Sequence, residues 1–185
     1  MQGFINLAAD IGQALAVLVP FLCYTIGGSF ILGSGWGFWQ MAKPGSWFQS
    51  RPWVPFTTLF IGATLLSFDR MLNYANNTIG GGTQTSLSQV MTSYTAPTAD
   101  GSSIVGNSPE DTLTNIIYLF EYFFLSYGAL MVLLGVLALK GISEGTRRHG
   151  PSLALVQIVF GLAVMNIDTI APGIMSYFAN ATPAT

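Results

Sequence analysis

The sequence predicts an all-helical integral membrane protein with four transmembrane helices, arranged as two tandem helical hairpins with both termini outside. Its composition is 51% hydrophobic and only 8% charged, with a mean hydropathy of +0.54, whereas soluble domains carry about 25% charged residues. Four apolar stretches reach or nearly reach the length of about 20 residues that a helix needs to cross the hydrocarbon core of a bilayer. Short motifs of the first half also recur in the second half.

The first hairpin is expected over residues 1–73, with spans at about 12–32 and 54–72. Pro55 marks the start of the second span, because proline is favoured in the first turn of a helix. Pro20 lies inside the first span and should kink or shorten it. The N-terminal segment carries no basic residue before the apolar run, so the first span is expected to remain in the protein rather than act as a cleaved signal.

A polar connection follows over residues 74–112, rich in Ser, Thr, Gly and Asn and without a basic residue. We expect a partly ordered loop outside the membrane, because this segment can bury little apolar area. The alternative is that "QTSLSQVMTSY" forms a short helix on the membrane surface. A loop of this length is often functional.

The second hairpin is expected over residues 113–185, with spans at about 116–139 and 153–178. The motif "SPEDT" marks its first helix, with Ser108 as N-cap, Pro109 at the first helical position and two acids in the first turn. Pro151 marks the start of the last span in the same way, and Pro172 should kink or shorten that span.

The basic residues predict the orientation. Five of the six Lys and Arg residues fall in the two short connections, namely Lys43, Arg51, Lys140, Arg147 and Arg148. By the positive-inside rule, both connections face the cytoplasm, which places the termini and residues 74–112 outside. In the alternative interpretation, these loops form a functional surface that points at a lumen or at lipid head groups. All four tryptophans surround the first connection, as in an aromatic belt at the membrane interface.

Two pairs of motifs suggest that the hairpin is duplicated. "FLCY" at residues 21–24 matches "FLSY" at 124–127, and "GATLLSFD" before Arg70 matches "GLAVMNID" before Thr169. Both members of the second pair have a glycine seven residues ahead of an aspartate. Because both hairpins would start outside and turn inside, the repeat would be parallel in topology.

Small residues mark faces on which helices can approach closely in lipid. Thr25, Ser29, Gly33 and Gly37 recur every four residues, and Ser126, Gly128 and Gly135 form a less regular set in the second hairpin. Three interpretations remain open: contacts within the monomer, contacts between subunits of an oligomer, and a permeation path lined by glycine.

Ionisable residues within or at the ends of the predicted spans need an explanation, because charged groups in lipid are costly and often functional. These intramembrane polar residues are Arg70, Glu121 and Asp168. One hypothesis pairs Arg70 with Glu121 or Asp168 between helices. Asp10 and Asp69 are instead expected to reach water at the interface.

The sequence shows no catalytic constellation, cofactor motif or metal-ligand spacing, so we expect no enzyme. Its single histidine, His149, is expected to be solvated, and its single cysteine, Cys23, to be a small buried residue. The net charge of -2 and the scattered basic residues argue against sequence-specific nucleic-acid binding. Four spans without a broken helix pair would also make a poor secondary transporter.

The segments "FLCYTIGGSFILGSG" and "FLSYGALMVLLGVLALKGISEG", together with the chain length and the four-span layout, resemble the small multi-span inner-membrane proteins of type IVB secretion and conjugation systems, the IcmC/DotE and plasmid TraQ families. This resemblance implies a structural subunit of a protein or DNA translocation machine in the bacterial inner membrane. It implies other secretion components as partners and carries over no active residues.

Each half also looks like a conjugative pilin, with two apolar helices and a short basic loop. A pilin-like chain would form a homo-oligomer in contact with membrane lipid and would be incorporated into an extracellular or envelope-spanning assembly. The alternative function is a small oligomeric membrane channel or transporter.

Overall fold

The structure is a computed structural model that describes residues 2–79, 109–146 and 150–181. Every regular element in these residues is a helix, which confirms the all-helical fold class. In chain order the helices are α1 (Gln2–Met41), α2 (Trp47–Ser50), α3 (Trp53–Leu66), α4 (Phe68–Ile79), α6 (Pro109–Ser143), α7 (Pro151–Met165) and α8 (Ile167–Ala181). Most of the predicted polar loop, together with Ser108, Arg147, Arg148 and His149, lies outside the described residues.

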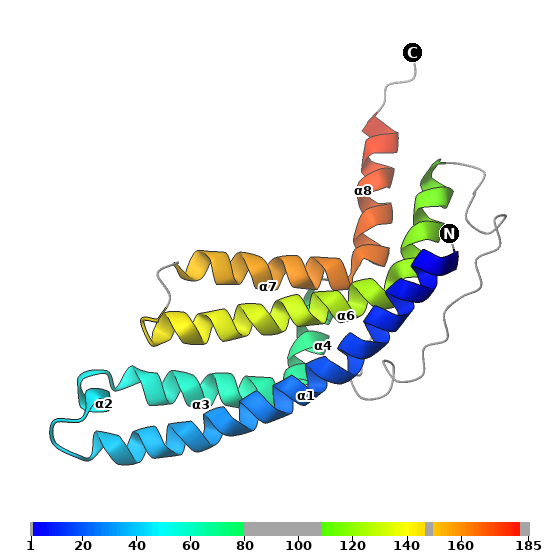
Figure 1. Cartoon of the computed structure of the whole chain (residues 1–185). Coiled ribbons are helices and arrows are strands. Elements are labelled where there is room, and N and C mark those ends of the chain that lie inside the picture. The colour runs from blue at the N-terminus through cyan, green and yellow to red at the C-terminus, as the bar shows by residue number, and fades with distance from the viewer. Residues whose placement is uncertain (1, 80–108, 147–149, 182–185) are drawn as a thin grey trace.

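The helices form two hairpins that lie side by side (Figure 1). In the first hairpin α3 packs against α1, and in the second α7 packs against α6. The long helices α1 and α6 contact each other and run in the same direction, so the connections that follow them lie at the same end of the molecule (Figure 1). Helices α4 and α8 leave the hairpins at the opposite end of α3 and α7.

The helix boundaries correct the predicted spans. α1 and α6 are longer than expected, and both are long and apolar enough to cross a membrane. The predicted spans 54–72 and 153–178 are each broken into two helices, at Ser67 and Asn166. α7 and α8 meet at a bend of 85° and together supply a third span only if the bent pair crosses as one. Four continuous transmembrane helices, and the outside position of the termini, are therefore not confirmed.

Proline does not cause these breaks. Pro20 lies inside α1 and Pro172 lies inside α8, so neither proline ends its helix. At the second break, the side-chain amide of Asn166 donates a hydrogen bond to the carbonyl oxygen of Leu162 at 2.8 Å. Asparagine and serine side chains compete with the backbone for hydrogen bonds in this way, which favours helix ends.

The core lies where the two hairpins meet. Its fully buried side chains come from α1, α3, α4 and α6, and include Val19, Leu65, Phe68, Leu72, Ala129, Val132 and Leu133. Cys23 belongs to the same cluster and is 2% exposed, which confirms the expectation of a small buried residue. The first residues of α4 therefore help to hold the two hairpins together.

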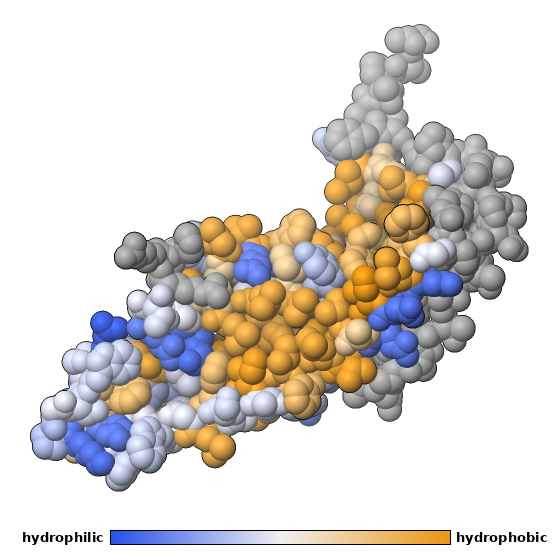
Figure 2. All heavy atoms as spheres, viewed as in Figure 1, coloured by the Kyte–Doolittle hydropathy of each residue, from blue (hydrophilic) through white to orange (hydrophobic). Residues whose placement is uncertain are grey.

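The outer surface of the hairpins is strongly apolar. Phe21, Phe60 and Val156, from three different helices, are all more than half exposed. Figure 2 shows a hydrophobic belt over the middle of the molecule, with hydrophilic residues at the end that carries α2. Soluble monomers rarely expose apolar patches of this extent. This surface and the long apolar helices indicate a membrane protein.

Two matched glycine contacts close the hairpins. A methyl group on Gly27 of α1 would lie 3.1 Å from the carbonyl oxygen of Gly62 of α3, and one on Gly62 would lie 3.0 Å from that of Gly27. In the second hairpin, the corresponding distances between Gly128 of α6 and Gly161 of α7 are 2.6 and 2.8 Å. Only residues without a side chain permit such close backbone approach in both hairpins.

Candidate functional site at the helix breaks

Each hairpin has a helix break at the same position. Ser67 has φ −106° and ψ 28°, and Asn166 has φ −108° and ψ 28°. The backbone N–H of each donates to the carbonyl oxygen four residues earlier, at 3.0 and 3.2 Å respectively. Each break is followed two residues later by an acid, Asp69 or Asp168, in the first turn of the next helix. The two matched sequence motifs therefore have the same backbone conformation at the helix break.

Unpartnered polar atoms gather at the second break. Asn166 is 1% exposed, and within the described structure its Oδ1 atom accepts no hydrogen bond. The Oδ1 atom of Asp168 is also buried without a partner there. Glu121 lies half-buried on α6, which contacts α8, and the negative charges of Glu121 and Asp168 repel each other. Two carboxyl groups and an amide oxygen therefore share an otherwise apolar region.

This arrangement limits the chemistry of the site. Polar and ionisable groups inside a membrane-spanning bundle often mark a path for ions or protons. Broken helices in membranes supply oxygen atoms for monovalent cations in the same way. The described residues contain no group of three or more His, Cys, Asp or Glu side chains that could hold a metal ion. The unpartnered oxygen atoms of Asn166 and Asp168 make the second break the polar site of this otherwise apolar region.

The predicted ion pair between Arg70 and an acid of another helix is not formed. Arg70 is exposed on the outer side of α4, where it lines a groove with residues of α3. The ion pair that the described residues do form is Lys140 with Glu144, whose Nζ and Oε1 atoms lie 2.6 Å apart. The pairing hypothesis is wrong because the side chain of Arg70 faces away from the contact between the hairpins.

The predicted small-residue positions divide into two groups. Gly128 and Gly135 lie in the contact between α6 and α7, Gly37 lies against Pro55, and Ser126 is fully buried. These four residues serve contacts within the chain. Thr25, Ser29 and Gly33 are instead exposed on α1, and a methyl group on Gly33 would meet no atom within 4 Å. We refer to these three residues as the open face of α1.

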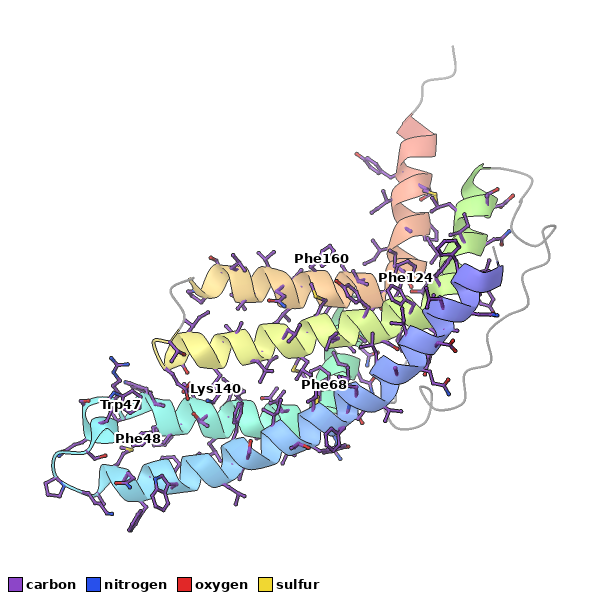
Figure 3. The ribbon with its side chains drawn as sticks, viewed as in Figure 1. Trp47, Phe48, Phe68, Phe124, Lys140 and Phe160 are labelled. Atoms are coloured by element: carbon purple, nitrogen blue, oxygen red, sulfur yellow. The ribbon has the colours of Figure 1, made fainter. Side chains whose placement is uncertain are left out.

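The structure brings the two basic connections together. The Arg51 guanidinium donates a hydrogen bond through Nη1 to the backbone carbonyl of Glu144 at 3.1 Å, which links the first connection to the end of α6. A second link joins the hydroxyl groups of Thr57 and Ser143 at 3.2 Å. Figure 3 shows Trp47 and Phe48 at this end of the molecule, with Lys140 on the neighbouring hairpin.

The basic side chains at this end lie on aromatic rings. The Nζ atom of Lys43 lies 3.5 Å from the ring centroid of Trp39, and that of Lys140 lies 4.3 Å from the centroid of Phe30. Such cation–π contacts are worth about 0.5–1 kcal/mol at exposed sites. The tryptophans Trp36, Trp39, Trp47 and Trp53 are all exposed around these charges. Tryptophan and basic residues together are typical of a membrane interface.

The chain matches no known protein-family model, no curated protein and no solved structure. The function of the candidate site is therefore inferred from its geometry.

Sequence reasoning missed two kinds of residue at these sites. It assigned no role to Ser67 and Asn166, although both stand directly before the motif's apolar residue and aspartate, and both residue types compete with the helical backbone. It also assigned no role to Gly27, because the small residues that recur every four positions, such as Thr25 and Ser29, lie on another side of α1. The repeat gives no signal for Gly27, because aligning "FLCY" with "FLSY" places Thr25, not Gly27, opposite Gly128.

Proposed function

We propose that this chain is a structural, oligomerising subunit of a type IV (IVB-like) secretion or conjugative transfer apparatus in the bacterial inner membrane. The observation that carries the proposal is the open face of α1, formed by Thr25, Ser29 and Gly33. The contacts within each hairpin use other glycines, so this small-residue face remains available to a neighbouring subunit. Small residues on a lipid-exposed helix favour helix association.

The finer assignments follow from the same proposal. The matched breaks and the matched glycine contacts support an ancestral hairpin duplication. In the proposed topology, α3 with α4 and α7 with α8 supply the second and fourth crossings, and both termini lie outside. The basic end, with Lys43, Arg51 and Lys140, would then face the cytoplasm and point at a lumen or at lipid head groups. The role is structural rather than enzymatic, as in a pilin-like subunit.

Affinity purification tests this proposal directly. Tagged protein would be extracted from native membranes in a mild detergent, its partners identified by mass spectrometry and the complex sized. We expect several secretion or conjugation components to co-purify with a complex larger than the monomer. Recovery of a monomer without such components would contradict the proposal.

Gly33→Leu is expected to disrupt assembly while leaving membrane insertion intact. The larger side chain would separate the open face from its neighbour, whereas within the chain it meets no atom within 4 Å. We expect the purified complex to shift toward the monomer in size-exclusion chromatography with light scattering. Gly35→Leu is the matched control, because Gly35 is equally open but lies about 200° around the helix. Equal effects of the two substitutions would exclude the open face as the contact.

A small oligomeric channel or transporter is the second candidate function. The sequence predicted no broken helix pair, which disfavoured a transporter. The structure has a helix break in both hairpins. Glu121, Asn166 and Asp168 supply polar atoms at the second break. We expect Glu121→Gln to reduce proton or sodium flux into proteoliposomes, because it removes an ionisable group from the proposed path. Wild-type protein that carries no flux above empty vesicles would eliminate this function.

A further inference from the structure

The outer side of the first helix break forms a groove of about 600 Å³. The residues that line it recur at helical spacing along α3 and continue across the break into α4. Phe60 and Ala63 form the α3 part, and Arg70 and Tyr74 form the α4 part. Phe60 and Tyr74 are 75% and 73% exposed, so the rest of the described chain leaves this face uncovered.

The groove is apolar at one end and basic at the other. Its walls are mainly hydrocarbon, with Phe60, Ala63 and Met71 on the side of α3 and the first turn of α4. Arg70 lies on the α4 side, and no ion pair of Arg70 occurs within the described residues. The other described basic residues, Lys43, Arg51 and Lys140, lie at the end that carries the connections. The groove thus carries one isolated positive charge.

In the proposed topology, on which this step rests, the position of the groove along the membrane matches this polarity. The 14 residues of α3 rise about 21 Å, so Arg70 lies beyond most of the roughly 30 Å hydrocarbon thickness measured from Trp53. α4 is amphipathic and carries Asn, Thr and Tyr side chains, which suit the level of the lipid head groups. An arginine at this level forms strong, bidentate hydrogen bonds with phosphate.

We propose that this groove binds one anionic phospholipid, with the phosphate on Arg70 and an acyl chain along Phe60 and Ala63. Charge complementarity supports this occupant, because an exposed guanidinium at the polar end of an apolar groove suits an anion that also has a hydrocarbon tail. A protein partner could supply the charge, but the order of apolar and basic groups along the membrane normal is that of a lipid.

The second hairpin provides an internal comparison. Its outer groove, of about 410 Å³, is lined by Leu155, Val156, Val159, Phe160 and Ala163 and contains no basic side chain. The position that corresponds to Arg70, three residues after the break, is occupied by Thr169. We therefore expect this second groove to contact lipid tails without selecting for an anionic head group.

Photo-crosslinking in nanodiscs tests the site. Full-length protein would be placed in phosphatidylcholine nanodiscs that contain a small fraction of phosphatidylglycerol with a photoactivatable acyl chain. Peptides that carry cross-links would then be identified by mass spectrometry. We expect cross-links on α3 and α4 near Ala63, and we expect Arg70→Gln to reduce them about fivefold, since one basic residue near a membrane surface contributes about that factor.

Three controls make the result specific. Arg70→Lys should keep most of the cross-linking, because it keeps the charge. Lys43→Gln, at the basic end, should leave the α3 and α4 cross-links unchanged. A phosphatidylcholine probe should label these helices equally in wild type and Arg70→Gln.

Ala63→Phe, which fills the groove without changing charge, should lower labelling by either probe. Labelling by phosphatidylglycerol that is insensitive to Arg70→Gln would overturn the proposal. The same conclusion would follow if Arg70→Gln altered the size of the complex and left lipid labelling intact, because the partner of Arg70 would then be a protein.

Discussion

Gly161→Ala is expected to lower the free energy of unfolding by about 1–3 kcal/mol, the usual cost of overpacking a close contact. The added methyl group would lie 2.8 Å from the carbonyl oxygen of Gly128 and 2.9 Å from the backbone nitrogen of Val132. Because both are backbone atoms, no side-chain rotation can relieve the contact. α7 would have to move away from α6 and lose dispersion contacts along the hairpin. Thermal unfolding of the purified protein in one detergent would measure the loss.

Two other glycines turn this prediction into a ranked series. Gly62→Ala should cost less, because its methyl group would lie 3.0 Å from the Gly27 carbonyl oxygen and 3.1 Å from side-chain atoms of Phe30 and Ile31, all longer than the contacts at Gly161. Gly35→Ala should be neutral or stabilising, because the site is open and alanine favours helix by up to about 1 kcal/mol over glycine. A flat series, or a loss at Gly35 as large as at Gly161, would show that glycine contacts do not hold the hairpins together.

Asn166→Asp is expected to destabilise the protein by about 3–5 kcal/mol, the cost of leaving a charge buried without a partner. Asn166 is 1% exposed, and its amide donates to Leu162, so a carboxylate there would lose this hydrogen bond and face a carbonyl oxygen. The charge of Asp168 two residues later would add repulsion. Chemical or thermal unfolding with a folding check by circular dichroism would measure the effect.

Asn166→Leu is the control that separates structure from ion binding. Leucine removes the unpartnered amide oxygen, and the Leu162 carbonyl oxygen still accepts from the backbone N–H of residue 166, so the substitution creates no unsatisfied buried group at this position. We therefore expect a stability near that of the wild type. A large loss of stability in Asn166→Leu, equal to that of Asn166→Asp, would show that the side-chain hydrogen bond to Leu162 is essential for the fold. A stable Asn166→Leu protein that has lost ion flux would assign the amide oxygen to an ion path.

Several parts of the fold were predictable because they depend on local chemistry. Pro109 and Pro151 start α6 and α7 as expected, since a proline in the first turn loses no helical hydrogen bond. The basic residues that follow α1 and α6 indicated which connections lie together, and Arg51 and Glu144 do meet there. The continuity of the second and fourth spans was not predictable from hydropathy, because Ser67 and Asn166 interrupt stretches whose neighbours are apolar.

The candidate sites depended more on three-dimensional arrangement. Arg70 and Glu121 were an attractive pair in sequence, as single charges of opposite sign in apolar surroundings. They do not pair, because α4 packs with Phe68 and Leu72 buried and Arg70 exposed on its outer side. Arg70 is two positions from both Phe68 and Leu72, and residues two positions apart lie on nearly opposite faces of a helix. The side of α4 that packs therefore determines which of these residues is exposed.

By itself, the sequence determined that this protein is helical and apolar, because composition and hydrophobic length act through the solvent rather than through any particular contact. It also determined where the matched motifs lie. Only the tertiary structure decided which small residues meet, since Gly27 and Gly33 are alike in sequence but only Gly27 faces another backbone. The reason is that helix rotation and crossing are set by side chains from both partners at once.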